Sequence, residues 1–393
     1  TDLIGVDPFD PFLTDDMKTK IVHECFTNKF YYFRECLRVS QKGSNTPVRY
    51  QLHLGNLSIH FLRWMNLNSY LELPRQCGKS IGAAAEFGYD FLFAENSEMG
   101  VFNYNNDMVK TNIERITQML DLLPHFMRWH TLEKVADKDN PDLVDFKIKP
   151  KSNARKMSAT MDMRGNLIKG KTPGINKSQA DEAGRGATML HQWWDEPCAI
   201  RNFDIAVGAA FPSYVTASRE ARKNGASYSI MITSTPPDID SEQGKFLLNF
   251  VKMQMKTWSV LFFDKSRAEL ENILDKDSKN GFFYCTFQYF MVGKDMGWYQ
   301  EQLKSLAGQE DVIRREILLI WDKSIVDNPY SIEDLNALER TIRNFGNFVE
   351  IEILPALFFK VFCNKQPDGP GSFKQTMKYI RTKRILLASD VSG

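Results

Sequence analysis

The chain has 393 residues, which is long enough for two or three domains with an ample core, and its formal net charge of +1 excludes a global polycation. Hydrophobic residues make up 43% and charged residues 25%, as in ordinary globular proteins, and no apolar run approaches the roughly 20 residues of a membrane span. The six cysteines are scattered without CxxC spacing, so the sequence predicts neither a zinc site nor a disulfide framework. We expect a cytosolic protein, trimmed at its start because Thr1 is not an initiator.

The first 69 residues predict helices that pack beside a core. Residues 1–50 are mixed in character, and residues 51–69 carry apolar positions spaced as on one face of a helix. The first segment also contains an aromatic cluster that we expect to pack as a helical cap, formed by Phe26, Phe30, Tyr31, Tyr32 and Phe33.

Residues 73–80 predict a phosphate-binding loop. They read Leu-Pro-Arg-Gln-Cys-Gly-Lys-Ser, follow an apolar stretch, and precede a good start to a helix that we expect to run to about Phe93. In a strand–loop–helix of this kind, backbone N–H groups hold phosphates, the Lys reaches the β and γ oxygens, and the Ser ligates Mg²⁺. Leu73 stands where the usual motif has its first Gly, so an ordinary loop at a helix start is the alternative.

The next hundred residues predict a strand, a helix and a polar region. A strand is expected near residues 100–104, followed by a helix that Asp107 could cap and that stops at Pro124. Residues 131–180 are polar, with strand-like pieces at 143–148 and 156–159. Basic residues in this region could contact nucleic acid, although a solvated face is the alternative: Lys147, Lys149, Lys151, Arg155, Lys156, Arg164, Lys169, Lys171 and Lys177.

Two later strands predict the rest of a nucleotide site. One ends at Asp195-Glu196, where the Asp could hold Mg²⁺ and the Glu could activate a water against the γ-phosphate. His191 and Gln192 make it less apolar than a central parallel strand should be. The other, residues 228–237, runs into a hydroxyl-rich turn (Thr233, Ser234, Thr235) suited to sensing the γ-phosphate. Three such elements in this order predict an ATPase.

The alternation of strands and helices predicts an α/β fold, a P-loop NTPase whose mainly parallel sheet is flanked by helices and binds ligands at its carboxyl edge. Beyond it, residues 298–320 look helical, and residues 331–381 look like a helix followed by an irregular connection. The last ten residues, 384–393, begin a strand that ends at Asp390.

Residues 75–80 match the Arg-Gln-x-Gly-Lys-Ser/Thr loop common in the large terminase, the DNA-packaging motor of tailed bacteriophages, and the chain resembles that family over residues 50–393. Further segments resemble the family in the same order. They are residues 120–126 after the first motif, Arg185-Gly186 ahead of the Asp-Glu pair, residues 233–236 as the coupling motif, Arg315-Glu316 at the end of the ATPase domain, and the strand ending at Asp390.

The resemblance implies how the chain is organised. Residues 51–297 would be the P-loop ATPase core, 298–330 a small helical lid subdomain, 331–382 a linker, and 383–393 the truncated start of a ribonuclease-H-like nuclease domain, with residues 1–50 as the helical cap. It implies ATP and Mg²⁺ as cofactors, and double-stranded DNA, a portal protein and a small terminase subunit as partners. It also implies a ring on the procapsid, in the host cytoplasm and absent from the mature virion, with no membrane partner.

Chemistry and resemblance together assign roles to single residues. Lys79 would neutralise phosphate charge, Ser80 and Asp195 would hold Mg²⁺, and Glu196 would position or activate the water. The expected ATP-binding residues are Gln51, Arg75, Gln76, Cys77, Gly78, Lys79 and Ser80, and the expected coupling residues are Thr233, Ser234 and Thr235.

Three further assignments have open alternatives. Arg75 could act as an arginine finger in cis or be a surface or nucleotide-sensing arginine, and Arg185 could act across a subunit boundary or form a structural salt bridge. Gln51 could read adenine or be an ordinary glutamine. Asp390 would be the first nuclease metal ligand, but one carboxylate cannot hold two metals, so we expect this chain not to cut DNA.

Two rival functions share these motifs. A helicase-like, nucleic-acid-dependent ATPase would have the same Gly-Lys-Ser and Asp-Glu, but no second core domain with its own arginine motif is apparent. An ATP-binding assembly module with little turnover is disfavoured because both Lys79 and Glu196 are present.

Overall fold

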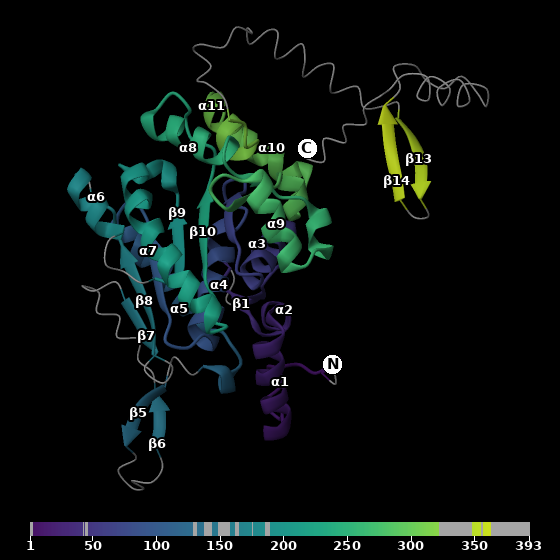
Figure 1. The fold of residues 1–393 in the computed structure, drawn as a ribbon. Coiled ribbons are helices and arrows are strands. Elements are labelled where there is room, and N and C mark those ends of the chain that lie inside the picture. Colours follow the sequence, from purple (N-terminus) through teal and green to yellow (C-terminus); the bar gives the residue numbers. More distant parts are fainter. Residues whose placement is uncertain are drawn as a thin grey trace. The chain divides into compact units, whose positions relative to one another are not determined.

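The computed structural model in Figure 1 describes residues 3–41, 43, 46–128, 132–136, 144–147, 158–161, 165–174, 176–184, 189–321, 348–354 and 357–362. The chain divides into two compact units, residues 1–322 and residues 323–393, and each is described by itself.

The first unit is built on a sheet of eight strands, in which seven neighbouring strands run parallel and only the edge strand β7 is antiparallel. This confirms the mainly parallel α/β fold. In spatial order the strands are β11 (Lys256–Thr257), β12 (Phe282–Thr286), β3 (Asn68–Glu72), β10 (Ser229–Ser234), β9 (His191–Asp195), β4 (Glu98–Phe102), β8 (Asn166–Lys171) and β7 (Ser158–Met161).

The strand order places the three predicted motifs side by side. β10, which carries the hydroxyl-rich turn, lies between β3, which leads into the phosphate loop, and β9, which ends at Asp195. Ser234 pairs with Glu72 in register, and Thr233 pairs with Asp195. Because the three strands are parallel and in register, their carboxyl ends meet at one edge of the sheet.

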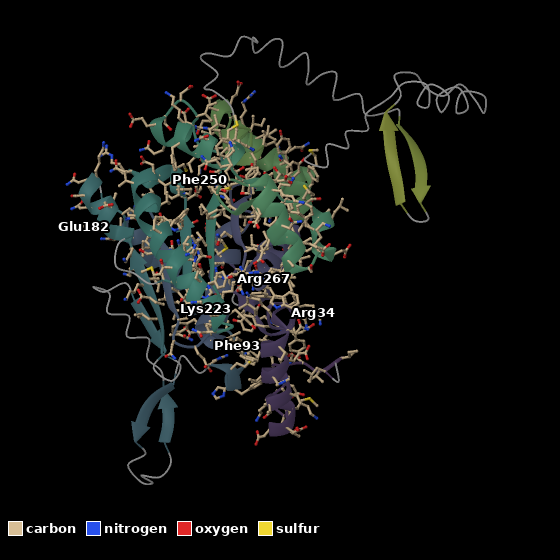
Figure 2. All side chains as sticks on the ribbon, viewed as in Figure 1. Arg34, Phe93, Glu182, Lys223, Phe250 and Arg267 are labelled. Carbon is tan, nitrogen blue, oxygen red and sulfur yellow. The ribbon has the colours of Figure 1, made fainter. Side chains whose placement is uncertain are left out.

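Side chains that alternate along each strand fill two hydrophobic clusters, one on each face. Trp193 belongs to one cluster and its neighbour Trp194 to the other, as do Phe283 and Phe282. The first face is covered by α3 (Leu54–Trp64), α4 (Lys79–Phe93), α5 (Asn106–Asp121) and α9 (Arg267–Asp277). The second face is covered by α6 (Lys177–Gly184), α7 (Phe203–Lys223) and α8 (Glu242–Lys252), whose Phe250 is labelled in Figure 2.

β9 is a central strand in spite of its two polar residues. All five of its residues are buried, including His191 and Gln192. The Gln192 side-chain oxygen accepts a hydrogen bond from Trp194 Nε1 at 3.0 Å, and His191 Nε2 lies 3.3 Å from the Ser227 hydroxyl. These hydrogen bonds offset part of the cost of burying the two side chains, whereas His191 Nδ1 makes no hydrogen bond within the described residues and lies 3.6 Å from Asp90 Oδ2.

α5 begins two residues earlier than its sequence suggests. The side chain of Asn105 accepts a hydrogen bond from Met108 N at 2.8 Å and caps the helix, whereas Asp107 lies inside the first turn. Asp107 was predicted as a possible cap. Both residue types favour this role, but only the amide of Asn105 reaches the free N–H group.

The N-terminal segment packs on the first face. It comprises α1 (Asp15–Thr27), α2 (Lys29–Tyr31), the π-helix η1 (Tyr32–Cys36) and a short antiparallel pair, β1 (Arg38–Val39) with β2 (Val48–Arg49). Tyr32 contacts the rings of Tyr89 and Phe93 on α4 edge-on, so the predicted aromatic cluster does pack against the core.

Buried charges join this segment to α4, and they join α4 to α3. Lys29 Nζ lies 2.6 Å from a Glu86 carboxylate oxygen, and Arg63 Nε donates to Asp90 at 2.8 Å. All four side chains are less than 5% exposed. The buried His60 lies between Glu86 (Nδ1, 2.6 Å) and the hydroxyl of Tyr50 (Nε2, 2.9 Å).

The segment predicted as helical over residues 298–320 is broken. α10 (Met296–Ser305) is followed by a glycine-containing turn, then by α11 (Glu310–Val312) and the π-helix η7 (Ile313–Ile317). The remaining short elements of the first unit are η2 (His125–Met127), the hairpin β5 (Leu132–Ala136) and β6 (Val144–Lys147), η4 (Pro197–Ala199), η5 (Val260–Asp264) and η6 (Tyr289–Val292).

In the second unit, the described residues form one antiparallel hairpin, β13 (Phe348–Leu354) with β14 (Leu357–Phe362). This hairpin was not predicted, because residues 331–381 were expected to form a helix followed by an irregular connection. The strand predicted at 384–393 and its Asp390 lie outside the described residues. Among the helices that the structure describes, none combines the length and the hydrophobicity needed to cross a bilayer.

Candidate nucleotide site

The predicted phosphate loop connects β3 to α4 and has the backbone of a tight turn. Gln76 and Gly78 have φ angles of +63° and +86°, and Gly78 is the residue at which α4 starts. The left-handed conformation at Gly78 is open to glycine at little cost. Lys79 and Ser80 therefore occupy the first turn of the helix, where free N–H groups and the helix dipole favour an anion.

Lys79 and Glu196 form an ion pair at this edge of the sheet. Lys79 Nζ lies 2.7 Å from Glu196 Oε1, although the two residues come from different strand ends. Glu196 itself has a left-handed backbone (φ 52°), held by a hydrogen bond from its N–H to Thr233 O at 2.8 Å. Burial raises the pKa of the Glu196 carboxyl above its ordinary value, while the Lys79 ammonium opposes that rise.

Asp195 is the centre of the site and is only 1% exposed. The Ser80 hydroxyl lies 3.3 Å from its Oδ1, and the Thr233 hydroxyl donates to the same oxygen at 2.6 Å. Two asparagine amides donate to its Oδ2: Asn112 at 2.9 Å and Asn103 at 3.3 Å. The structure thus brings the predicted Ser80, Asp195 and Thr233 together.

Asn103 and Asn112 were not predicted from the sequence. Asn103 directly follows β4, and a polar residue at the carboxyl end of a parallel strand is a signal that could have identified it. Asn112 lies in the middle of an amphipathic helix, where nothing in the sequence distinguishes it from a solvent-facing residue.

The donor set at this edge fits Mg²⁺. A serine hydroxyl and a carboxylate 3.3 Å apart are hard oxygen ligands of the kind that Mg²⁺ prefers. In the part of the chain that the structure describes, no group of three or more His, Cys, Asp or Glu side chains could hold a metal. A magnesium ion bound here would therefore take its remaining ligands from phosphate oxygens and water, as is usual for this metal.

Arg75 lies in the loop but is paired with a distant segment. Its NH1 group donates to Glu316 Oε2 at 2.6 Å, and its backbone N–H donates to Glu316 O at 2.7 Å. The side chain remains 59% exposed, so it is accessible from solvent. Whether Arg75 is an arginine finger stays a prediction.

The other predicted nucleotide contacts occupy different positions around the loop. Gln51 and Gln76 are exposed, and Cys77 is buried. Burial raises the pKa of the Cys77 thiol to about 11. Near the loop, His53 Nδ1 accepts from Asn56 N, and burial lowers the pKa of its imidazole to about 4, so it is neutral at physiological pH.

The three predicted coupling residues differ in what they contact. Thr233 reaches the site directly through Asp195. The Ser234 hydroxyl instead donates to Thr235 O at 2.8 Å, and it also lies 3.9 Å from Cys198 Sγ. Ser234 and Thr235 are buried at the carboxyl end of β10.

Several predicted residues lie away from the nucleotide site or outside the described residues. Arg185 and Asp390 lie outside the described residues, as do Lys149, Lys151, Arg155, Lys156 and Arg164. Of the basic candidates on β8, Lys169 pairs with Glu98 at 3.0 Å, and burial lowers the pKa of Lys171. These two lysines lie on a sheet strand, next to β4, and their contact with nucleic acid stays a prediction.

Comparisons with known proteins give remote resemblances. No protein-family profile and no curated protein matches the chain. The ATPase domain of the large terminase of Thermus phage P74-26 is 16% identical, with 70% of this chain and 95% of that one covered and a TM-score of 0.40. The large terminase of bacteriophage HK97 is 11% identical, with 73% of this chain and 53% of that one covered and a TM-score of 0.44. The chain is thus similar to phage large terminases, at values too low to carry an argument, and its site is interpreted from its own geometry.

Proposed function

We propose that this chain is a Mg²⁺-dependent ATP hydrolase, the ATPase part of a terminase-like motor that moves double-stranded DNA into a procapsid. One observation carries the hydrolase: Lys79, Ser80, Asp195 and Glu196 converge at the carboxyl edge of three adjacent parallel strands, with contacts of 2.7 Å and 3.3 Å between them. This is the set of groups that phosphoryl transfer to water requires.

Each side chain has a distinct task in this proposal. The Lys79 ammonium leaves Glu196 and binds the β and γ oxygens of ATP, because a polyanion attracts it more strongly than one carboxylate does. Glu196, released from Lys79, accepts a proton from water as the water oxygen attacks the γ-phosphorus. The bond from phosphorus to the bridging oxygen breaks, and ADP leaves.

Ser80 and Asp195 would hold a metal in the same proposal. A Mg²⁺ held there would supply positive charge to neutralise the phosphate oxygens. Asp195 is suited to this task because four hydroxyl and amide groups already fix its carboxylate in one orientation.

The motor function rests on the order and spacing of the motifs that resemble those of large terminases. In that reading the partners are double-stranded DNA, a portal protein and a small terminase subunit, and the chain assembles as a ring on a procapsid in the host cytoplasm. Arg185 would complete a neighbouring subunit's site.

The hydrolase is tested by measuring ATP turnover and nucleotide binding in Glu196→Gln and Lys79→Ala proteins. Glu196→Gln keeps the shape of the side chain but removes the base, so ATP should bind while turnover falls about 10²–10⁴-fold. Lys79→Ala should weaken ATP binding and also lower turnover. Glu182→Gln, an exposed glutamate of α6 labelled in Figure 2, is the matched control. Near-normal turnover in Glu196→Gln would remove this residue from the mechanism.

The motor is tested separately from the hydrolase. DNA-stimulated turnover without strand separation on a forked duplex is the expected result for a duplex translocase. Unwinding of the fork would instead favour the helicase-like alternative.

A further inference from the structure

Three of the four side chains that donate to Asp195, namely Thr233, Asn112 and Asn103, are each held in a fixed orientation by a second donor. Thr233 is the first case. Its hydroxyl oxygen accepts from Trp193 Nε1 at 2.8 Å, and an indole N–H can only donate. The hydroxyl proton of Thr233 must therefore point to Asp195 Oδ1, 2.6 Å away.

Asn112 is the second case. Its side-chain oxygen accepts from Arg115 NH1 at 2.6 Å, and a guanidinium has no acceptor. The amide nitrogen of Asn112 consequently faces Asp195 Oδ2, 2.9 Å away. Both residues lie on α5, one turn apart, so the helix itself maintains this pair.

Asn103 is the third case. Its side-chain oxygen accepts from the Tyr104 backbone N–H at 2.7 Å, which turns the amide nitrogen toward Asp195 Oδ2 at 3.3 Å. Asn103 and Asn112 are both fully buried. A rotated amide would put an oxygen against the carboxylate and leave an inner donor without a partner, which is costly in a buried site.

We propose that Asn112, with its amide held by Arg115, is a positioning residue that sets the Asp195 carboxylate for binding the metal–nucleotide complex. The inference rests on the proposed hydrolase function, because it assigns Asp195 to the metal. Among the described residues, the Asn112 side chain makes hydrogen bonds with Asp195 and Arg115, so it reaches the metal position through Asp195.

The geometry explains why the orientation of the Asp195 carboxylate matters for binding a metal. Asn112 and Asn103 occupy lone pairs of Oδ2, while the Ser80 hydroxyl makes only long contacts of 3.3 and 3.4 Å with the carboxylate. A metal and its water shell could therefore replace these long Ser80 contacts without displacing the amides or the 2.6 Å hydrogen bond from Thr233. Loss of the Asn112 amide would free the carboxylate to rotate and would lower the affinity for the metal. Hydrogen-bond partners that orient a metal ligand typically contribute about 10–100-fold to that affinity.

The test measures binding rather than turnover. Equilibrium titration with a fluorescent ATP analogue, in excess EDTA and in saturating Mg²⁺, gives for each protein the factor by which Mg²⁺ tightens binding. Asn112→Ala should reduce that factor about tenfold or more, with binding in EDTA unchanged. Electron paramagnetic resonance of Mn²⁺ in the nucleotide complex should show the same loss of metal affinity.

Arg115 supplies a second pair of variants that leaves Asp195 and Asn112 in place. Arg115→Met removes the group that orients the amide and should give an intermediate loss. Arg115→Lys keeps a donor and should restore the Mg²⁺ factor to near the wild-type value, which a merely space-filling role would not predict. Glu114→Gln, the exposed neighbour on α5, is the matched control. If Asn112→Ala fails to fold, the comparison of Arg115→Met with Arg115→Lys tests the proposal.

The outcomes separate the two proposals. A wild-type protein that binds nucleotide no better with Mg²⁺ than in EDTA would overturn the proposed hydrolase. If Mg²⁺ tightens nucleotide binding by the wild-type protein, two results would overturn only the role of Asn112. One is an Asn112→Ala protein whose Mg²⁺ factor is within twofold of the wild-type factor, and the other is an Asn112→Ala protein whose binding is weakened equally in EDTA and in Mg²⁺. Equal behaviour of Arg115→Met and Arg115→Lys would overturn the role of Arg115.

Discussion

Arg75 in the phosphate loop and Glu316 in the π-helix η7 are joined twice, through their side chains at 2.6 Å and through the Arg75 N–H and the Glu316 carbonyl at 2.7 Å. The two residues are 241 positions apart in the sequence. A second link lies close by, because Trp321 Nε1 donates to Glu72, the last residue of β3, at 3.1 Å. The segment that ends the first unit is therefore attached on both sides of the start of the phosphate loop.

This attachment allows the two roles of Arg75 to be separated. If Arg75 stabilises the transition state, Arg75→Ala should lower kcat about 10³-fold or more, as for other arginine fingers, while Glu316→Gln should leave kcat within about threefold. The thermal midpoint should barely change in either variant, because ion pairs this exposed contribute at most about 1 kcal/mol. Steady-state kinetics and thermal unfolding of both variants check this. Equal losses of kcat in both would indicate that the link, rather than the free arginine, matters.

Glu72 predicts a pH dependence of stability. It is fully buried, one of its oxygens has no hydrogen-bond partner, and burial raises the pKa of its carboxyl to about 7, although Lys252, Tyr284 and Trp321 oppose that rise. A folded pKa above the unfolded value means that the stabilising contribution is complete below pH 4.5 and is lost as the pH rises through about 7.

Glu72→Gln keeps the shape and the acceptor but cannot ionise. Its free energy of unfolding should match that of the wild type near pH 4.5 and exceed it at pH 8 by up to about 3 kcal/mol, from about 1.4 kcal/mol per pKa unit. Denaturant titrations of both proteins between pH 4.5 and 8 measure the difference. A difference that does not vary with pH would contradict the assignment.

Thr233 predicts a contrast between two conservative substitutions. Thr233→Val keeps the shape but leaves Trp193 Nε1 and Asp195 Oδ1 without their shared partner, so we expect a loss of about 1–3 kcal/mol in stability and a fall in turnover. Thr233→Ser retains the hydroxyl and should stay close to the wild type in both. Unfolding titrations and ATPase assays of the pair provide the test, and similar behaviour of Val and Ser would argue against the hydroxyl.

Gly82 predicts a steric coupling between α4 and α3. A Cβ at this position would lie 2.4 Å from Asn56 Oδ1 and 3.2 Å from Ile59 Cδ1. Gly82→Ala should therefore destabilise the protein by about 1–3 kcal/mol. Combined with Asn56→Ala, which removes the obstructing oxygen, the cost should be less than the sum of the two single changes. Strict additivity in unfolding free energies would show that the helices move apart instead.

Arg185 predicts complementation between subunits. Arg185→Ala and Glu196→Gln proteins should each be inactive alone, and mixing them should restore part of the turnover if Arg185 acts on a neighbour's nucleotide. Mixed assemblies verified by mass spectrometry and assayed for ATP hydrolysis provide the measurement. Assemblies that contain both variants and stay inactive would count against a role in trans.

The main features of the site were predictable because its chemistry is local in the sequence. Gly78-Lys79-Ser80, Asp195-Glu196 and Thr233 each lie at or just after the carboxyl end of a strand, and parallel strands bring these ends together. Asn112 could not be found in this way. Its role depends on which face of α5 meets Asp195, and that is decided by packing rather than by a motif.

The errors in the fold have similar causes. His191 and Gln192 were read as weakening a central strand, yet Gln192 has its partner two residues along the same face of the strand, in Trp194, and His191 has its partner in Ser227, which is distant in the sequence. The hairpin at 348–362 was missed because its strands, Phe348–Leu354 and Leu357–Phe362, were considered together with the polar residues around them. In both cases tertiary or cross-strand partners outweighed the local pattern.

The buried ion pair of Lys29 with Glu86 and the hydrogen bond of Tyr50 with His60 determine where this protein can be divided. A boundary at residue 50 appears natural from composition, but it separates Lys29 from Glu86 and Tyr50 from His60. Removing one partner of a buried ion pair costs about 3–5 kcal/mol, which is a large share of a domain's stability. A recombinant fragment that begins at residue 51 should therefore be poorly soluble, and expression designs for crystallography or single-molecule work should keep α1 to η1 with the nucleotide-binding core.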